Sequence, residues 1–248
     1  SSRTAKQLPR LRAPRLLESP TGKEVPMLET ERFILRPWCD ADAPTLFRWA
    51  SDPRVGPPAN WAPYVSVEHA REVLHAVYCA PDTFAICAKR PEKFDGAAIA
   101  RIEGAADFGD MTRGFSGRAF LRERKKVASA PLNPIGSIRF VKPDHANCAI
   151  EDNDREMGIW LGAPFWGFGI APEVASAMLR YGFGERGFSA IWVCNFVENA
   201  TSARAKDKLG FELVRLEEAT NPVTGVVRTQ QVSVLTKSSW EGMQKATE

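Results

Sequence analysis

The sequence predicts an α/β or α+β domain with a mixed sheet, on three observations. The 248 residues are 44% apolar, 25% charged and 10% aromatic, values typical of globular domains and unlike those of disordered or fibrous chains. Short alternating apolar runs, typical of strands, interleave with longer stretches that have a helical apolar period. No stretch approaches the ~18 uninterrupted apolar residues of a membrane-spanning helix, so no membrane association is expected.

The first half of the domain contains two predicted strands and two predicted helices. Residues 32–36 and 83–88 have strand patterns. A helix capped by Asp40 or Asp42 is predicted to run to about residue 50, and Ser66 is predicted to cap a second helix. A proline-rich loop, residues 53–63, separates the two helices.

Strands and helices also alternate in the second half of the domain, and the sequence shows no internal repeat. Two amphipathic helices are predicted at residues 172–184 and 199–209, the first with Pro172 at its first helical position. The expected strands are residues 135–141, 156–161, 189–197, 211–217 and 227–236.

Three segments are predicted to lie outside this alternation. Residues 1–26 are basic and proline-rich and are interpreted as a flexible tail, with the remnant of an organelle transit peptide as the alternative. Residues 90–133, rich in glycine and basic residues, are interpreted as an insertion, and 243–248 as a C-terminal tail. The domain itself is therefore predicted to span residues 27–242.

Charge and cysteine usage exclude several classes of protein. The net charge is +3, but the excess of basic residues lies near the N-terminus and in the insertion, so the body is mildly acidic and no nucleic-acid partner is expected. Five scattered cysteines without a C-x-x-C pair predict buried, reduced thiols and a cytoplasmic location, with mitochondrial import of a precursor as the alternative. The three histidines form no metal-binding pattern, so no metal is expected.

The most informative stretch is residues 156–173, EMGIWLGAPFWGFGIAPE. A strand leads into a loop that contains Gly167 and Gly169, and a helix follows. Glycines allow successive main-chain N–H groups to converge, and a helix N-terminus attracts phosphate, so this loop is a candidate phosphate site. A P-loop is excluded because Ile170-Ala171-Pro172 replaces the required Lys-Ser/Thr, and a dinucleotide fingerprint fits poorly.

A second motif lies downstream, in residues 199–211, NATSARAKDKLGF: a helix that starts with Asn199 and ends in Lys-Leu-Gly-Phe. Together the two motifs resemble the GCN5-related N-acetyltransferase (GNAT) superfamily, most closely its ribosomal-protein N-terminal acetyltransferase branch. The opening LETERFILR of residues 28–36 and the Pro63-Tyr64 pair also resemble that branch. The resemblance covers about residues 27–240 without the insertion.

The resemblance implies a mostly antiparallel sheet with a V-shaped splay between strands 156–162 and 189–197, in which acetyl-CoA binds. Main-chain groups of Trp160, Leu161 and Gly162 would pair with the pantetheine arm, and Asn199 and Ser202 would face its thioester end. The pyrophosphate would be held by the loop residues Trp166, Gly167, Phe168, Gly169, Ile170 and Ala171. Phe168 departs from the family, which often has Arg or Lys there.

Acetyl transfer to an amine requires a base, donors for the developing negative charge and an acid for the leaving thiolate. Glu156 stands at the spacing of a general base in related enzymes, and a strand acid on the surface is the alternative. The usual tyrosine acid is missing, which leaves Ser202 as the substitute or as a packing residue. Glu173 is interpreted as a partner of the helix dipole.

Trp61 and Tyr64, in the loop between the first two helices, are candidates for lining the acceptor pocket, with anchoring of the loop as the alternative. The predicted function is transfer of acetyl from acetyl-CoA to a primary amine by direct attack in a ternary complex. The branch resemblance implies a protein N-terminus as acceptor. The alternatives are a small amine, such as a polyamine or an antibiotic, and a non-catalytic acyl-CoA-binding module. A monomer or a homodimer is expected.

Overall fold

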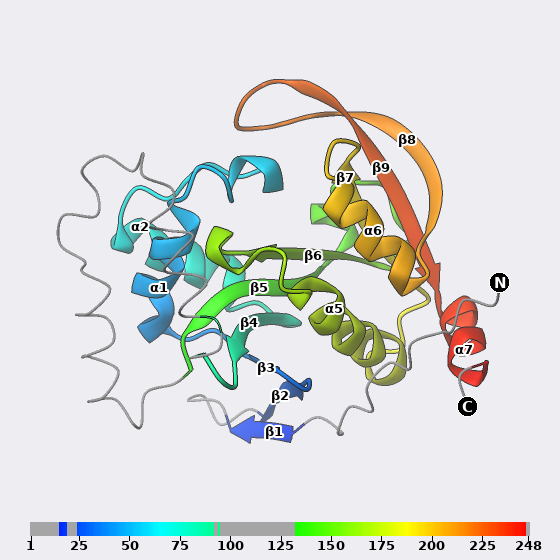
Figure 1. Cartoon of the computed structure of the whole chain (residues 1–248), viewed down its shortest axis with the longest axis horizontal. Helices are drawn as coiled ribbons and strands as arrows, with labels where there is room; N and C mark the ends of the chain where they lie inside the picture. Colours follow the sequence, from blue (N-terminus) through cyan, green and yellow to red (C-terminus); the bar gives the residue numbers. More distant parts are fainter. Residues whose placement is uncertain (1–14, 19–23, 92–93, 95–131, 247–248) are drawn as a thin grey trace.

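A sheet forms the centre of the fold. The computed structural model describes residues 15–18, 24–91, 94 and 132–246, and within them nine strands form one sheet in the order β1-β2-β3-β4-β5-β6-β7-β9-β8 (Figure 1). All neighbouring strands are antiparallel except β6 and β7, which are parallel. The strands are β1 Arg15–Glu18, β2 Glu24–Glu29, β3 Phe33–Arg36, β4 Thr83–Ala88, β5 Pro134–Val141, β6 Arg155–Leu161, β7 Ala190–Phe196, β8 Glu212–Thr220 and β9 Val227–Thr236.

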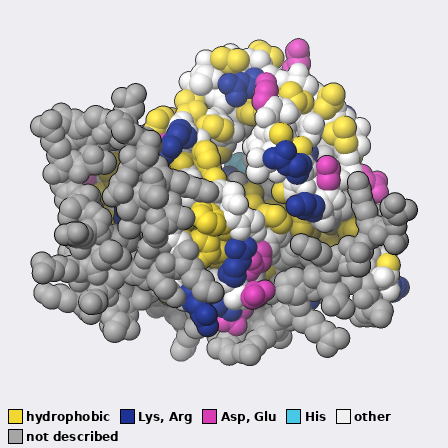
Figure 2. All heavy atoms as spheres, in the orientation of Figure 1, with side chains coloured by type: hydrophobic (Ala, Val, Ile, Leu, Met, Phe, Trp, Pro, Cys, Tyr) yellow, Lys and Arg dark blue, Asp and Glu magenta, His cyan; other side chains and the backbone are white. Residues whose placement is uncertain are grey.

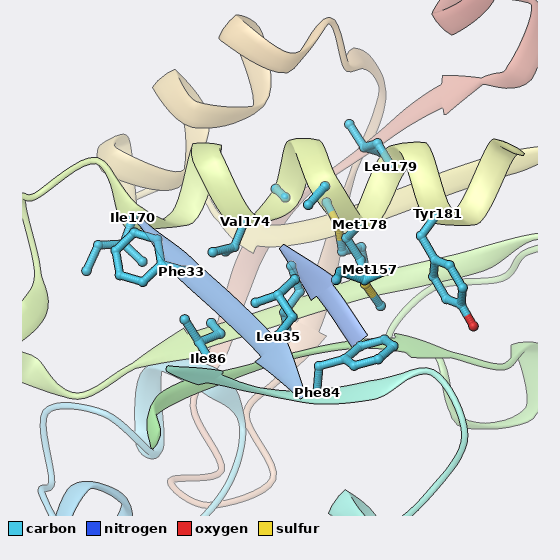
Figure 3. Packing of buried hydrophobic residues seen from close by; sticks show 14 of the residues in the cluster. Phe33, Leu35, Phe84, Ile86, Met157, Ile170, Val174, Met178, Leu179 and Tyr181 are labelled. Carbon is cyan, nitrogen blue, oxygen red and sulfur yellow. The ribbon is translucent and has the colours of Figure 1, made fainter. Parts of the chain in front are cut away.

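Helices cover both faces of the sheet. The described helices are α1 Ala43–Ala50, α2 Val67–Val73, α5 Ile170–Arg180, α6 Ala200–Leu209 and α7 Lys237–Lys245. Apolar residues of α5 form one core cluster with the strands, and those of α1 and α2 form a second one. Figure 3 shows Val174 and Met178 pointing from α5 toward the sheet, where Leu35 and Met157 lie. The predicted α/β fold with a mixed, mostly antiparallel sheet is confirmed.

Local sequence signals account for the helix ends. The Ser66 hydroxyl accepts a hydrogen bond from the His69 N–H and caps α2, as predicted, and the Asn199 side chain caps α6 by accepting from the Ser202 N–H. Gly210 ends α6 in the left-handed conformation, with φ of 83°, where a residue with a Cβ would be strained. A π-helical turn, Leu74–Tyr78, extends α2.

Three predicted boundaries were wrong. Residues 15–18 and 24–26, expected in a flexible tail, belong to strands β1 and β2, which pair antiparallel at the edge of the sheet. Helix α5 begins at Ile170 rather than Pro172, because a proline is equally well tolerated in the first turn, where main-chain N–H groups have no partner inside the helix. Helix α7 was not predicted and extends beyond residue 242, because Trp240 packs on Phe183.

The predicted insertion, residues 90–133, lies almost entirely outside the described residues. Within them Phe94 is buried and its ring packs on the rings of Phe33 and Phe168. No described helix is long and apolar enough to cross a membrane.

The thiols follow the prediction only in part. None of the five cysteines forms a disulfide, and Cys87 and Cys148 are buried. Cys79 is exposed, because it lies at the end of the π-helical turn that follows α2.

Candidate functional site

The sheet opens between its two parallel strands. Strands β6 and β7 pair only at Arg155–Ile191 and Glu156–Trp192. Beyond these pairs, β6 continues to Leu161 while it remains paired with β5, and β7 continues beside β9. The two central strands therefore diverge, as the predicted splay requires. Figure 2 shows the surface hollowed here, over β6 and between α6 and the segment that leads from α1 to α2.

The register decides which main-chain groups of β6 face this opening. The Gly162 N–H donates to the Ile135 carbonyl of the strand next to it at 2.9 Å. Because main-chain groups alternate sides along an antiparallel strand, those of Trp160 and Gly162 point to β5, and those of Ile159 and Leu161 point into the opening. The Leu161 carbonyl accepts a hydrogen bond from Trp166 Nε1 at 2.8 Å. Of the three predicted main-chain partners, only Leu161 is thus aimed into the gap, and Ile159 was missed.

The glycine-rich loop leads from β6 to the N-terminus of α5. Gly167 and Gly169 have φ of 83° and 67°, so both require the left-handed conformation that glycine adopts without strain. Gly169 is the N-cap of α5, and no side chain of the described residues caps this helix end. The first main-chain N–H groups of α5 are therefore left for an external partner, and the helix dipole favours an anionic one.

Arg32 holds this loop from the turn between β2 and β3. Its guanidinium donates to the carbonyl oxygens of Phe168 at 2.9 Å and Gly169 at 3.1 Å, and its Nε lies 2.6 Å from Glu173 Oε2. Glu173 Oε1 also accepts from the Thr30 hydroxyl and the Arg32 N–H. Glu173, in the first turn of α5, is thus a structural anchor as well as a partner of the helix dipole.

The contacts of Phe168 account for an aromatic side chain at a position where the family often has Arg or Lys. Its ring is half-buried, packs on the first core cluster and meets the Phe94 ring edge-on at 5.6 Å between centroids. A charged side chain would lose these contacts. The loop therefore presents main-chain groups rather than a side-chain cation at this position, while Trp166 and Gly167 beside it are exposed.

Glu156 is buried where β6 and β7 begin to diverge. Only 3% of the residue is exposed. Its Oε2 accepts from the Asn147 N–H at 2.5 Å and its Oε1 from Asn147 Nδ2 at 2.7 Å. Burial raises the pKa of this carboxyl above its ordinary value, and the two donors from Asn147 and the charge of Arg139 oppose that rise. The alternative of a surface acid is wrong, and a buried carboxyl with a raised pKa is the kind of group that serves as a base near neutral pH.

Arg139 shares the face of the sheet with Glu156. It pairs across from Gly158 while Val141 pairs with Glu156, so Arg139 and Glu156 are diagonal neighbours on β5 and β6. Within the described part of the chain, Arg139 makes no hydrogen bond or ion pair, and its half-buried side chain passes over Gly158. Its charge lowers the pKa of Glu156, Tyr64 and Tyr78 relative to burial alone.

The predicted aromatic residues form a cluster around β6. Trp61 lies 5.2 Å from Tyr64 and 5.8 Å from Trp160 between ring centroids. Tyr64 is buried in the second core cluster, and its hydroxyl is hydrogen-bonded to Tyr78, whose oxygen also accepts from Trp160 Nε1 at 3.1 Å. Tyr64 therefore anchors its loop, whereas Trp61 remains half-exposed beside β6.

Asn199 and Ser202 lie together at the start of α6. The Asn199 side chain accepts from the Ser202 N–H at 3.0 Å, so its oxygen is used for capping. Ser202 is half-exposed in the first turn of the helix, and no contact joins it to Glu156. The structure does not bring the two predicted catalytic residues together.

A cavity of about 410 Å³ lies between the proline-rich loop and the hairpin of β8 and β9. Asn221 in the hairpin turn donates through Nδ2 to the Pro57 carbonyl at 2.8 Å and so joins the two walls. The cavity is lined by Asn60, Asn147, Glu217, Glu218, Ala219, Thr220, Pro222 and Gln230. Asn147 thus borders the cavity and also contacts Glu156. In the described residues, no cluster of three or more His, Cys, Asp or Glu could hold a metal ion.

Four residues of the site escaped sequence reasoning: Arg32, Arg139, Asn147 and Ile159. Arg32 lies within the LETERFILR opening, so that motif was a usable signal for it. The contacts of Asn147 depend on how a loop folds back on β6, for which the sequence shows no periodic pattern.

Comparison with known proteins supports the two motifs. A family model described as an acetyltransferase (GNAT) domain matches residues 32–212. A Bacillus subtilis protein named uncharacterized N-acetyltransferase YoaA is 28% identical over 187 residues, which are 75% of this chain and 83% of that protein.

Solved structures of acetyltransferases have the same fold. A GNAT-family acetyltransferase from Bacillus anthracis superposes with a TM-score of 0.58 at 16% identity, covering 86% of this chain and 99% of that one. Spermidine N-acetyltransferase from Vibrio cholerae, solved with CoA and spermine, gives 0.57 at 13% identity, covering 84% and 98%. At these identities the structures establish similarity of fold alone.

Proposed function

The chain belongs to the GNAT family of acetyltransferases, and on that premise we propose that it acetylates the α-amine of a protein N-terminus with acetyl-CoA as donor. N-acetyltransferase activity follows from the family and from the named relatives. The proposal concerns the acceptor and the residues that act on it. The observation that carries it is the guanidinium of Arg139 beside the buried carboxyl of Glu156, where β6 and β7 diverge.

The residues around the opening suit an acyl-CoA. Main-chain groups of Ile159 and Leu161 face the gap and can pair with an extended amide-bearing arm as an added strand would. The uncapped N-terminus of α5 and the loop of residues 166–171 offer N–H groups to a pyrophosphate. Acetyl-CoA supplies an activated thioester, whose carbonyl carbon accepts the amine.

Glu156 is the proposed general base. An ammonium has no lone pair, so the acceptor must lose a proton before its nitrogen forms the C–N bond and the C–S bond of the thioester breaks. The carboxylate takes that proton, directly or through a water, and the second proton that the nitrogen loses as the amide forms goes to the departing thiolate. Because no described contact of Ser202 indicates a role toward the leaving thiolate, we assign no residue as the acid.

Arg139 favours an α-amine over a polyamine. Its guanidinium, which has no ion-pair partner among the described residues, lies diagonal to the Glu156 carboxyl on the same face of the sheet. An α-amine of a peptide has a carbonyl oxygen three bonds from the nitrogen, which suits a cation beside the base. A polyamine carries further positive charges that this guanidinium would repel. A spermidine acetyltransferase shares the fold, so a small amine remains the second candidate.

Three measurements test the proposal. Acetyl-CoA and CoA should raise the melting temperature by a few degrees at ~100 times the dissociation constant, whereas NAD and ATP should not. CoA release should then depend on added peptides with a free N-terminus. Glu156→Gln should lower kcat by about 100-fold or more with acetyl-CoA affinity retained. Binding without turnover on any amine would instead identify a non-catalytic acyl-CoA-binding module.

A further inference from the structure

One asparagine holds both oxygens of the buried carboxyl. Asn147 donates its main-chain N–H to Glu156 Oε2 at 2.5 Å and its side-chain Nδ2 to Oε1 at 2.7 Å. The residue lies in the connection between β5 and β6, outside any helix or strand. Both contacts come from a single residue, so the position of this one loop residue sets the plane in which the carboxylate lies.

Asn147 is itself held from two sides. The main-chain carbonyl of Asn147 accepts a hydrogen bond from Gln230 Nε2 at 3.1 Å. Gln230 Nε2 also donates to Glu217 Oε1 at 2.7 Å. The Oδ1 of Asn147 lies 3.5 Å from Asn60 Nδ2 in the proline-rich loop. Gln230 is buried on β9, and Asn60 and Gln230 also line the cavity beside Asn147. Asn147 is therefore held independently of Glu156, and moving the whole residue away would break contacts to β9, the proline-rich loop and β6.

The other charged or titratable groups around Glu156 do not provide hydrogen bonds equivalent to those of Asn147. Arg139 acts from β5 through its charge, without a hydrogen bond to the carboxyl. On β7 the Cys194 thiol is hydrogen-bonded to Cys148 of the loop, and this bond, burial and the charge of Glu156 all raise the pKa of Cys194. Glu217 on β8 is paired with Arg215 at 2.7 Å. None of these groups donates a hydrogen bond to the carboxylate, and among the described residues only Asn147 does.

We propose that Asn147 is the positioning residue of Glu156: its two donors orient the buried carboxylate and keep it ionised for proton transfer at the mouth of the gap. This inference rests on the proposed role of Glu156 as the base. A buried carboxylate that loses a donor becomes harder to ionise, and a neutral carboxylic acid cannot take a proton from the amine.

The direct test measures the Glu156 carboxyl in the full chain by ¹³C NMR titration, with Glu156→Gln to assign its resonance. Asn147→Leu removes the side-chain donor at nearly constant volume, and Asn147→Asp replaces it with a second carboxylate. Both keep the main-chain N–H. We expect the titration midpoint to rise by about one pH unit in Asn147→Leu and further in Asn147→Asp, where like charges share the site.

The matched control is Asn153→Leu. Asn153 lies in the same connection, and its Nδ2 donates to the Ser189 hydroxyl at 2.8 Å, away from Glu156. This variant should leave the midpoint unchanged. An unchanged midpoint in Asn147→Leu, or an equal shift in Asn153→Leu, would overturn the assignment.

Kinetics separate this inference from the proposed function. The acid limb of the profile of kcat/KM against pH should move with the NMR midpoint, so that activity lost by Asn147→Leu near neutral pH returns at higher pH. A merely structural defect would lower the whole profile without moving it. The midpoint of the NMR titration tests the role of Asn147 even if the enzyme shows no turnover with any acceptor. Full activity of Glu156→Gln would refute the proposed base alone.

Discussion

Arg32 and Glu173 form an ion pair, 2.6 Å from Nε to Oε2, that ties the turn before β3 to the first turn of α5. The same guanidinium donates to two carbonyl oxygens of the glycine-rich loop. With those carbonyls turned toward Arg32, the N–H groups of the loop are left for another partner. Arg32, 136 positions before Phe168 in the chain, thus sets the shape of the candidate phosphate site.

Replacing Arg32 should therefore weaken the binding of acetyl-CoA through the shape of the loop rather than through a contact of Arg32 with the ligand. Arg32→Met removes hydrogen bonds to a carboxylate and to two carbonyls, and we expect the Kd for acetyl-CoA to rise at least about tenfold, equivalent to ~1.4 kcal/mol. Isothermal titration calorimetry measures this change. Arg54→Met, which removes an ion pair with Asp52 in the proline-rich region, is the control and should leave the Kd unchanged. Equal affinities in the two variants would contradict this role.

Gly169 should be needed for its conformation. It has φ of 67°, and among the described residues a Cβ there would meet only Arg32 Nη2 at 3.9 Å, so strain rather than a clash opposes alanine. Gly187, with φ of 68° and open space around it, is a matched control. Both alanine variants should lose about 1–2 kcal/mol in the free energy of unfolding, measured in urea. Only Gly169→Ala should also raise the Kd for acetyl-CoA.

The alternation of strands and helices could be read from the sequence because each element buries one face. Strand β4 was predicted with its observed bounds, and the Ser66 and Asn199 caps lie at the predicted ends of their helices. β1 and β2 could not be predicted because they lie among prolines and basic residues, and their pairing depends on a sheet edge. Helix α7 is stabilised by packing of Trp240 on Phe183, a contact distant in sequence.

The site was predictable where it depends on local backbone chemistry. The loop glycines indicated a left-handed turn before a helix, and the structure has one. The contacts around Glu156 could not be predicted, because Asn147 reaches it through the fold of an irregular loop. The register of the sheet decides whether the main-chain groups of Trp160 and Leu161 point to β5 or into the opening. A shift of the register by one residue reverses this. The hydrogen bonds of Arg32 to the glycine-rich loop could not be predicted either, because they join segments far apart in the chain.

The stability of the protein should depend on pH through Glu156. Burial raises the pKa of the folded carboxyl above the unfolded value of about 4.3. Between these two values the folded state binds more protons than the unfolded state, so this group's contribution to the free energy of unfolding falls as pH rises through the window. Glu156→Gln lacks this proton, so wild type should lose stability relative to the variant from about pH 4 upward. Thermal unfolding across pH measures the difference, and a constant difference would exclude a raised pKa.

Tyr78 should stabilise the wall of the site by a hydrogen bond. Its buried hydroxyl oxygen accepts from Trp160 Nε1 and is hydrogen-bonded to the Tyr64 hydroxyl. Tyr78→Phe leaves both donors without their acceptor, at an expected cost of about 1–3 kcal/mol in the free energy of unfolding, seen as a lower melting temperature. Tyr181→Phe, on the other face of the sheet, should also lower stability but leave the KM for the acceptor unchanged. A stable Tyr78→Phe would show that water replaces the hydroxyl.

Arg139 should decide between the two classes of acceptor. If its guanidinium binds the carbonyl next to an α-amine, Arg139→Met should raise the KM for a peptide with a free N-terminus about tenfold and leave that for spermidine unchanged or lower. Arg139→Lys retains the charge but not the planar pair of donors, so it should lie in between. Initial rates of CoA release with each acceptor measure the KM.

Two controls make this comparison decisive. Arg155, on the neighbouring strand β6, is bonded to the carbonyls of Asp152 and Asp154, so Arg155→Met should change neither KM. The acetyl-CoA affinity of each variant shows whether the donor site is intact. A wild-type enzyme that prefers spermidine, or an Arg139→Met variant that loses both activities equally, would contradict the peptide assignment. A selective loss of peptide activity would identify Arg139 as the residue that reads the acceptor, because only the peptide has an oxygen for its guanidinium to bind.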